Sequence, residues 1–399
     1  MQPMDPTRLA QERLLRVSRM LEGYVTRGEL SGAGALIGIG SEIAYREAFG
    51  MQNREAATPL TTDTLFRIMS MTKPVTAMAA MLLYEEGHFD LNTPIHKFLP
   101  AYKRMKLLVD RGEGKAELEE TDAAITFRHL FTHTSGISYG SQPDDRLDLL
   151  YREALAQTPD DAASETIQDF ARKLADLPLA FVPGSQWRYG FNLDVLGALV
   201  ETIAEQPLEE FMRERIFKPL GMVDTGFTVP EQKAHRLAVV YRRDSESGAL
   251  VPSDVPIPLA ARMWGGGGLV STLDDYGRFA AMLANGGETM GTRLLSPTTA
   301  AMFGMNWATP EAVVSFLKAN PAVHGGYGFG LGGAVLLDPT QTGMFGNPGE
   351  YYWGGAFSTY FWVDPKLSLY GVVMTQFNPN WGYPIPWQFK QLVYQALVN

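Results

Sequence analysis

The chain has 399 residues, with 34 Lys or Arg against 44 Asp or Glu, so its formal net charge is −10. This acidity disfavours nucleic-acid binding and polybasic attachment to a membrane surface, because both need clustered positive charge. The absence of cysteine excludes disulfides, cysteine-ligated zinc and a cysteine nucleophile. The 45% of hydrophobic residues can build a large core, which excludes general disorder.

The N-terminal segment does not have the pattern of a secretory signal. Charged residues stand at Asp5, Arg8, Glu12 and Arg13, and no apolar run follows them. The uncharged apolar stretch over residues 74–84 is too short to cross a bilayer. We therefore expect a cytoplasmic protein that acts on a small molecule, without membrane or nucleic-acid partners.

The first half of the chain begins with a helix and a hairpin. Asp5-Pro6 is a typical helix start, and apolar residues at helical spacing then predict a helix over residues 6–27. Strands over 35–39 and 43–49, around Gly40-Ser41, predict a hairpin. The remaining predictions are a helix over 71–86, mostly helical structure over 100–225 with helices at 192–205 and 208–217, and an exposed polar piece starting at Pro159.

The C-terminal part returns to strands. Residues 230–262 read as irregular, and a glycine run at 265–268 precedes a helix over 273–285. The stretches 327–337, 357–363 and 367–376 are strand-like, and a helix over 387–398 ends the chain. The simplest α+β solution is one antiparallel sheet built from both termini and flanked by helices, with a mostly helical insertion. We place the sheet domain at 1–75 with 260–399 and the helical domain at 76–259, with the active site between them.

The first nucleophile candidate is the serine of Ser70-Met71-Thr72-Lys73. It stands at the start of the strongest predicted helix, where unpaired N–H groups and the helix dipole favour developing negative charge. Lys73 follows one turn later on the same face, so its amine can reach the Ser70 hydroxyl as a base. The alternative is that Ser70 is only a helix cap and Lys73 a surface cation.

Two other serines compete with Ser70. Ser138 lies in the Gly-x-Ser-x-Gly pattern of residues 136–140, but a helix and not a buried strand precedes it, and a polar loop follows. Ser315 and Lys318 repeat the Ser-x-x-Lys spacing in what reads as a short exposed helix over 311–319. We therefore interpret both as structural. The sequence also lacks a metal-ligand spacing such as His-Glu-x-x-His, so we expect no metal and no organic cofactor.

Two further segments carry candidate site residues. Tyr189 ends a loop before the helix at 192–205 and can serve as a second base or proton relay, or simply pack as a half-buried residue. Trp353-Gly354-Gly355 precedes a strand expected from Ala356, and glycines at the head of an edge strand permit close approach of a ligand. A backbone N–H there, together with that of Ser70, could form an oxyanion hole.

These motifs together resemble the serine β-lactamase and penicillin-recognising family, in particular the family VIII carboxylesterases. The resemblance rests on residues 66–74, 128–136, 183–197, 265–282 and 353–365, in the order of that family. It implies that Ser70 is acylated, that Lys73 and Tyr189 form the base pair, and that the N–H groups of Ser70 and Ala356 form the oxyanion hole. It also implies that His129 and His133 are structural.

Two departures from the β-lactamases point to esters. Phe191 stands where those enzymes have an Asn that bonds the drug's amide, and Trp353 stands where their Lys-Thr-Gly motif has the Lys that attracts its carboxylate. Loss of both polar partners favours an aromatic-walled site for uncharged esters, with Phe191, Trp353, Gly354 and Gly355 binding substrate. The predicted function is a serine carboxylesterase for short-chain or small aromatic esters. An acyltransferase, a peptidase, a weak β-lactamase or a non-catalytic penicillin-binding-like protein remain alternatives.

Overall fold

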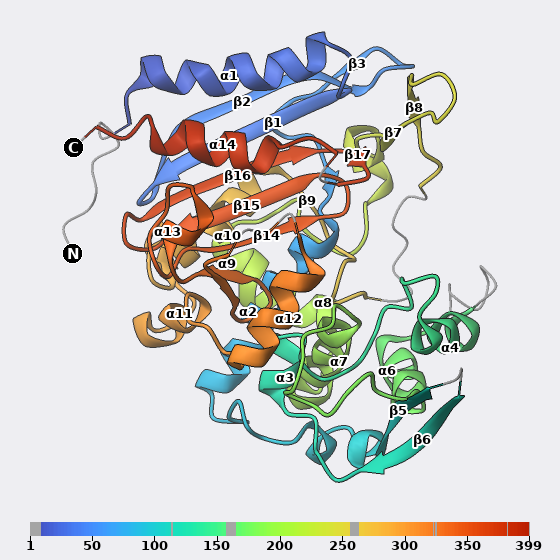
Figure 1. The fold of residues 1–399 in the computed structure, drawn as a ribbon. Coiled ribbons are helices and arrows are strands. Elements are labelled where there is room, and N and C mark those ends of the chain that lie inside the picture. The colour runs from blue at the N-terminus through green and yellow to red at the C-terminus, as the bar shows by residue number, and fades with distance from the viewer. Residues whose placement is uncertain are drawn as a thin grey trace.

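The computed structural model describes residues 9–112, 115–156, 165–255, 263–321, 323, 325–380 and 382–398. Figure 1 shows a sheet-based part that contains both ends of the described chain and a mainly helical part beside it. The predicted helix start at Asp5-Pro6 and the polar piece at Pro159 lie outside the described residues. No helix in the described ranges combines the length and the apolarity that crossing a membrane requires.

An antiparallel sheet of eight strands forms the centre of the sheet-based part. Its strands are β1 (Gly32–Ile39), β2 (Glu42–Asn53), β3 (Thr58–Pro59), β12 (Tyr327–Phe329), β13 (Ala334–Leu336), β14 (Tyr351–Gly355), β15 (Thr359–Asp364) and β16 (Leu369–Thr375). They lie in the order β12-β13-β14-β15-β16-β1-β2-β3. Because β1 pairs with β16 over seven residue pairs, from Ala33↔Thr375 to Ile39↔Leu369, the sheet joins the two ends of the chain, as predicted.

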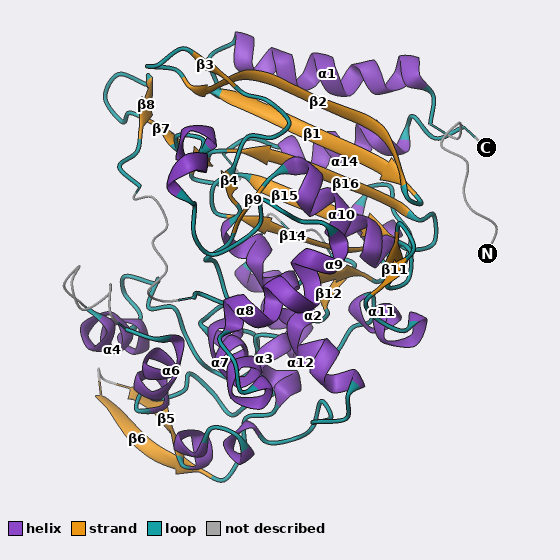
Figure 2. Cartoon of the chain, turned by 180° about the vertical axis from the view of Figure 1, so that it is seen from behind, coloured by secondary structure: helices purple, strands orange, loops and turns teal. Residues whose placement is uncertain are grey.

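Helices cover both faces of this sheet. Helices α1 (Gln11–Thr26) and α14 (Ile385–Tyr394) pack on one face, and α10 (Leu273–Ala284) packs on the other, as Figures 1 and 2 show. Alternate residues of β1 serve the two layers: Ala35 and Ile37 join the cluster under α1 and α14, whereas Leu36 joins the cluster under α10. Gly277 brings α10 close, since a Cβ there would lie 2.9 Å from Leu36.

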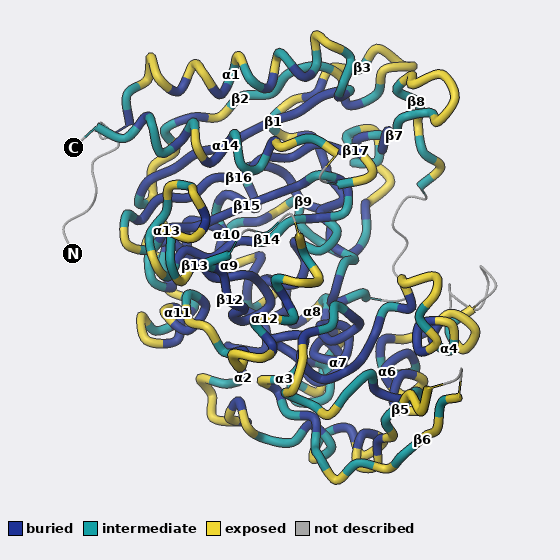
Figure 3. Tube along the Cα trace, in the orientation of Figure 1, coloured by how far each residue is buried: buried dark blue, intermediate teal, exposed yellow. Residues whose placement is uncertain are grey.

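The helical part continues from the α10 side of the sheet. Its elements are α2 (Thr72–Glu85), α3 (Phe127–Phe131), α4 (Arg146–Leu155), α6 (Ile167–Ala175), α7 (Asn192–Ala204), α8 (Leu208–Met212) and a hairpin of β5 (Met105–Gly112) and β6 (Lys115–Thr121). One buried apolar cluster runs from Leu36 and Leu273 to Met78 in α2 and Leu199 in α7, and Figure 3 shows this interior in dark blue. The division into domains at residues 75 and 260 stays a prediction.

Short elements connect these parts. The helical ones are α9 (Lys218–Leu220), α11 (Pro297–Phe303), α12 (Pro310–Ala319), α13 (Pro339–Thr342), the 3₁₀ turns η2 (Met69–Met71), η3 (Ile95–Lys97), η4 (Pro100–Lys103) and η6 (Glu231–Arg236), and the π-helical turn η5 (Arg213–Phe217). The strands are β4 (Phe66–Arg67), β7 (Tyr241–Arg243), β8 (Leu250–Pro252), β9 (Val270–Ser271), β10 (Glu288–Thr289), β11 (Thr292–Arg293) and β17 (Phe377–Asn378).

The structure corrects several predicted elements. The strand expected over 327–337 is the hairpin of β12 and β13, because glycines turn the chain where Gly330 N–H donates to Gly333 O at 2.8 Å. The strand expected over 357–363 begins at Thr359, and β14 before it escaped prediction. The hairpin β5–β6 lies in the segment expected to be mostly helical, and the last helix spans 385–394 and not 387–398.

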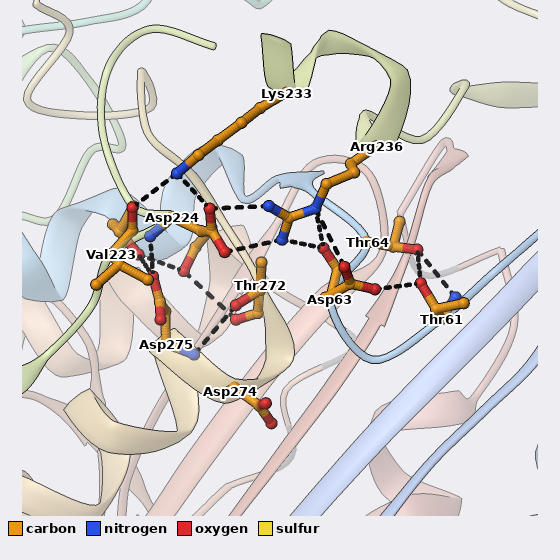
Figure 4. Close-up of polar contacts among 12 residues, drawn as sticks. Thr61, Asp63, Thr64, Val223, Asp224, Lys233, Arg236, Thr272, Asp274 and Asp275 are labelled. Atoms are coloured by element: carbon orange, nitrogen blue, oxygen red, sulfur yellow. Dashed lines mark hydrogen bonds and ion pairs between the residues drawn. The ribbon is translucent and has the colours of Figure 1, made fainter. Parts of the chain in front are cut away.

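A charged network holds the start of α10 near the strand pair β4–β9 (Figure 4). Asp224 accepts hydrogen bonds from Lys233 at 2.6 Å and from both terminal nitrogens of Arg236 at 3.0 and 2.8 Å. Its own N–H donates to Asp275 at 2.7 Å, and Arg236 lies 3.3 Å from Asp63. Burial raises the pKa of Asp275 to about 6. Thr225, which donates to Asp275, also bonds Ser271 of β9, so the network supports the β4–β9 pair, and β4 ends shortly before Ser70.

A second ionic pair lies in the core between the sheet and α14. Lys390 and Glu350 are both 0% exposed and lie 2.5 Å apart. The Tyr394 hydroxyl also donates to Glu350, at 3.0 Å, and burial raises the pKa of Glu350 to about 7. The negative charge of the buried Glu350 carboxylate is therefore balanced mainly by the Lys390 ammonium group.

Lys390→Met should lower the free energy of unfolding by about 3 kcal/mol, because it leaves Glu350 buried without its cation. The double variant Lys390→Met/Glu350→Leu should recover most of that loss, since neither charge remains. Urea unfolding followed by tryptophan fluorescence measures both. An equal loss in the single and double variants would contradict the role assigned to the pair.

Candidate active site

Ser70 and Lys73 lie side by side where η2 meets α2. Ser70 is the second residue of η2, and the preceding Met69 has a left-handed φ of 47°, a backbone conformation that costs a non-glycine residue about 1–2 kcal/mol. Lys73 is in the first turn of α2, and its Nζ lies 3.1 Å from Ser70 Oγ. The predicted contact between the two side chains is therefore present.

The Lys73 amino group is 0% exposed and needs compensation from the protein. Its Nζ donates to Gly266 O at 2.6 Å, and the rings of Tyr189 and Tyr139 lie with their centroids 4.7 and 5.5 Å away. Contacts to an aromatic face are favourable for a cationic amine. The segment that carries Gly266 is held in turn by the bond from its N–H to Asp194 Oδ1, at 3.0 Å.

Tyr189 comes from the loop before α7. Its ring borders Lys73, and its hydroxyl accepts a hydrogen bond from Trp353 Nε1 at 3.3 Å. The ring stacks on Trp187, with 5.8 Å between centroids and 10° between planes. Tyr189 thus links the Lys73 side of the site to β14.

The predicted strand head at Trp353-Gly354-Gly355 has a different place in the sheet. These residues end β14, an interior strand, and Ala356 begins the turn into β15, where Ser358 N–H donates to Gly355 O at 3.1 Å. The prediction of a strand starting at Ala356 is wrong, because β14 ends at Gly355 and β15 begins at Thr359. β14 pairs with β13 only at Tyr351 and Tyr352, so Trp353, Gly354 and Gly355 have a strand partner on the β15 side alone.

The end of β14 nevertheless lies against the segment that leads to Ser70. A Cβ on Gly355 would lie 2.3 Å from Ile68 O, so only glycine permits this approach. Among the hydrogen bonds of the described residues, none is donated by the N–H of Ser70 or of Ala356. Both groups are therefore available as donors for a ligand.

Phe191 is 8% exposed and packs mainly within the protein. Its ring contacts Tyr139, Phe170 and Trp264 with centroid distances of 4.5, 4.9 and 5.9 Å. It thus belongs to an aromatic group next to Gly266. Trp353 and Gly354 are half-buried, so both keep accessible surface for a substrate.

Sequence reasoning missed Tyr139 and assigned no role to Gly266. A Cβ on Gly266 would lie 3.1 Å from the Tyr139 hydroxyl, which places that hydroxyl beside the carbonyl bonded to Lys73. Burial raises the pKa of Tyr139 above its usual range, so its hydroxyl stays protonated. Tyr139 is the fourth residue of the Gly-x-Ser-x-Gly pattern of residues 136–140. That pattern was therefore the available sequence signal for Tyr139, although its serine has no place beside Lys73.

Ser138 itself is held in a separate buried network. Its hydroxyl donates to Asp148 and accepts a hydrogen bond from Arg188 Nε at 2.9 Å. Arg188 also lies 2.8 Å from Asp148, and the hydrogen bonds and charge of these partners lower the pKa of that carboxyl. Ser315 donates instead to Trp187 O at 3.1 Å, from α12, while Lys318 is exposed. Neither serine has a base placed like Lys73.

The two histidines of the 128–136 segment have structural partners. His129 Nδ1 accepts the N–H of Thr126 at 3.2 Å and so caps α3. Burial lowers the pKa of His129 to about 4, and burial together with the nearby Lys73 lowers that of His133 well below its usual 6.5. Both imidazoles are therefore neutral near pH 7. The described residues contain no group of three or more His, Asp or Glu placed to hold a metal ion.

Proteins of known family are similar to most of this chain. The family model described as Beta-lactamase matches residues 17–395. The sequence is similar to Esterase EstB of Burkholderia gladioli, with 31% identity over 399 residues that cover 93% of each chain.

Solved structures show the same fold. The structure is similar to "EstCE1, a hydrolase with promiscuous acyltransferase activity", with a TM-score of 0.80 and 25% identity over 96% of this chain and 99% of the other. It is equally similar to simvastatin synthase (LovD) of Aspergillus terreus, with a TM-score of 0.80 and 27% identity over 96% and 97% of the two chains.

The depressed pKa of His129 predicts a loss of stability in acid. Between about pH 6.5 and 4 the unfolded chain binds a proton at His129 that the folded chain does not, so the free energy of unfolding falls as the pH falls through this window. His129→Gln keeps an acceptor for the cap and should flatten the slope. Denaturant midpoints at pH 4–7.5 for both proteins isolate the contribution, and parallel curves would refute it.

Proposed function

The chain belongs to the Beta-lactamase family and is a serine hydrolase-type enzyme, and on this premise we propose that it is a carboxylesterase that forms an acyl-enzyme on Ser70. The observation that carries the proposal is the 3.1 Å contact of Lys73 Nζ with Ser70 Oγ inside a wall of aromatic rings. The substrates are short-chain or small aromatic esters without charge. Within the family, the site resembles the family VIII carboxylesterases.

In the acylation step, Ser70 Oγ attacks the ester carbonyl and Lys73 with Tyr189 takes up its proton. Once Lys73 has released a proton, its uncharged amine can keep the hydrogen bond to Gly266 O and accept the Ser70 proton on its lone pair across the 3.1 Å contact. The resulting oxyanion binds to the N–H groups of Ser70 and Ala356. As the ester bond breaks, the alcohol leaves with a proton from the same pair.

Deacylation repeats these steps with water as the nucleophile. Water attacks the acyl carbon while Lys73 and Tyr189 accept its proton, and collapse of the second intermediate returns the proton to Ser70. The Trp353 indole N–H, bonded to the Tyr189 hydroxyl, stabilises negative charge on that oxygen whenever the phenol gives up its proton. The bond from Gly266 N–H to Asp194 holds the segment whose carbonyl orients Lys73.

Aromatic residues define the proposed selectivity. Trp353 provides an apolar wall where a β-lactamase would present a cation, and Phe191 offers no amide to a substrate. A carboxylate on the substrate would therefore be desolvated without a partner, which strongly disfavours it. Gly354 and Gly355 leave room for the substrate along the end of β14. We also propose that residues 1–75 with 260–399 form one domain, that 76–259 form the other, and that the site lies between them.

An acyltransferase is the second candidate. It is favoured by the structural similarity to simvastatin synthase and to EstCE1, a hydrolase with promiscuous acyltransferase activity. The acyl-enzyme would be the same, and an alcohol would replace water in the second step. The ratio of acid to transesterified product in the presence of added alcohols distinguishes the two.

Ser70→Ala should lower ester turnover by roughly 10³-fold or more, because no other described hydroxyl contacts Lys73 Nζ. Ser138→Ala is the matched control, since Ser138 is a buried serine whose hydroxyl, like that of Ser70, is hydrogen-bonded. It should cost some stability and leave turnover within about threefold. Steady-state kinetics with p-nitrophenyl butyrate and intact-protein mass after acylation test both. A label on Ser138, or activity that survives Ser70→Ala, would overturn the assignment.

The apolar wall at Trp353 predicts that, among p-nitrophenyl esters of similar reactivity, the enzyme prefers those without a charge. We expect kcat/KM for p-nitrophenyl butyrate to exceed that for a p-nitrophenyl hemisuccinate by about 10²-fold, because the carboxylate finds no cation beside Trp353. A β-lactam carrying a carboxylate should be turned over more slowly still. Trp353→Lys should lower the ratio of kcat/KM for the neutral ester to kcat/KM for the charged ester. Equal rates for the neutral and the charged ester would contradict the proposed selectivity.

A further inference from the structure

His133 is buried beside Tyr189 and has no part in the proposed chemistry. It follows α3 with a left-handed φ of 55°, and its side chain is 0% exposed. Its carbonyl accepts the N–H of Arg188 at 2.9 Å, so it holds the backbone next to Tyr189. The centroids of the His133 and Tyr189 rings are 4.7 Å apart.

A chain of hydrogen bonds sets the tautomer of this imidazole. The Ser135 hydroxyl donates to Asn192 Oδ1 at 2.5 Å, and Asn192 Nδ2 lies 3.0 Å from His133 Nδ1. Because an amide NH₂ can only donate, Nδ1 accepts and the ring proton is on Nε2. If the Asn192 side-chain amide had the opposite orientation, the Ser135 hydroxyl would face an NH₂ group and would have no acceptor there.

The Nε2–H lies among aromatic rings. No hydrogen-bond partner for His133 Nε2 is found in the described part of the chain. The rings around it are those of Tyr189, Phe329 and Trp187, with centroid distances of 4.7, 5.6 and 5.9 Å. The face of an aromatic ring is electron-rich and accepts N–H donors weakly.

The groups around the imidazole keep it uncharged. Burial is the main cause that lowers the pKa of His133, and a positive charge on Lys73 lowers it further. Lys73 of α2 and Tyr189 are the titratable groups that face the ring. The guanidinium of the adjacent Arg188 is engaged with Asp145 and Asp148. A neutral ring can therefore present the same N–H to its neighbours across the working pH range.

We infer that His133 is a positioning residue for Tyr189: its Nε2–H donates to the face of the Tyr189 ring, and its carbonyl anchors the backbone at Arg188. Together these contacts keep the Tyr189 hydroxyl beside Trp353 and the ring beside Lys73. A donor on the ring face also stabilises the phenolate, whose charge spreads into the ring. The inference rests on the proposed function, in which Tyr189 exchanges protons with Ser70.

The tautomer is tested on the wild-type protein without any substrate. Nitrogen-15 spectra of histidine-labelled protein should show, for His133, a protonated Nε2 and an unprotonated Nδ1 that do not change between pH 8 and 5. The signals are assigned by their loss in His133→Phe or, if that variant does not fold, by their shift in Asn192→Leu. A proton on Nδ1, or titration near pH 6.5, would overturn the inference.

The effect on the reaction is tested with His133→Phe, which keeps a ring of similar size and removes the N–H. We expect kcat for p-nitrophenyl butyrate to fall about tenfold with KM within about twofold, and the acidic limb of the pH profile to move up by about 0.5–1 unit. His133→Gln, which restores an N–H donor, should move the limb back toward the wild-type position.

His129→Phe is the matched control, since it removes a neighbouring half-buried imidazole that has a capping role only. It should lower stability and leave the pH profile in place. Labelling of Ser70 by a fluorophosphonate distinguishes a failure of the proposed function from a failure of the inference about His133. If the wild type is not labelled, the proposed function fails; if it is labelled and His133→Phe matches it in rate and pH profile, the inference about His133 fails.

Discussion

The buried amino group of Lys73 is the constraint around which this site is built. An amine without solvent contact is tolerated only where the protein supplies acceptors and electron-rich faces. Gly266 O, Ser70 Oγ and the rings of Tyr189 and Tyr139 provide them here. These partners come from η2, the 264–268 segment and two loops of the helical part. Satisfying one nitrogen therefore brings together segments that are far apart in the sequence.

Close backbone contact completes the arrangement on the sheet side. The left-handed turn at Met69 and the glycine at 355 let the segment before Ser70 lie directly against the end of β14. β14 pairs with β15 along its whole length and with β13 at Tyr351 and Tyr352, so strand pairing fixes its position. The backbone donors proposed for the oxyanion lie on the two sides of this contact, at Ser70 in η2 and at Ala356 in the turn after β14, so they are placed before a substrate arrives.

The substrate side of the site is apolar where a lactam-hydrolysing relative would be ionic. Trp353 contributes a ring wall and one indole N–H, and that N–H is directed to Tyr189. Tyr189 is in turn enclosed by Trp187, Tyr139 and His133. The same aromatic cluster therefore shapes the proposed pocket and positions a proposed proton carrier, so selectivity and catalysis are linked through shared packing.

The sequence alone was enough to predict the α+β sheet from both termini and to single out Ser70 and Lys73, because periodicity and i, i+3 spacing are local properties. The contact between their side chains is present in the structure. Only the tertiary structure decided that Trp353-Gly355 end a strand of the sheet, that Tyr139 and Gly266 border Lys73, and that His133 lies against Tyr189 and Asn192. These facts depend on strand pairing and on hydrogen bonds between residues as distant as Lys73 and Gly266, which no local pattern records.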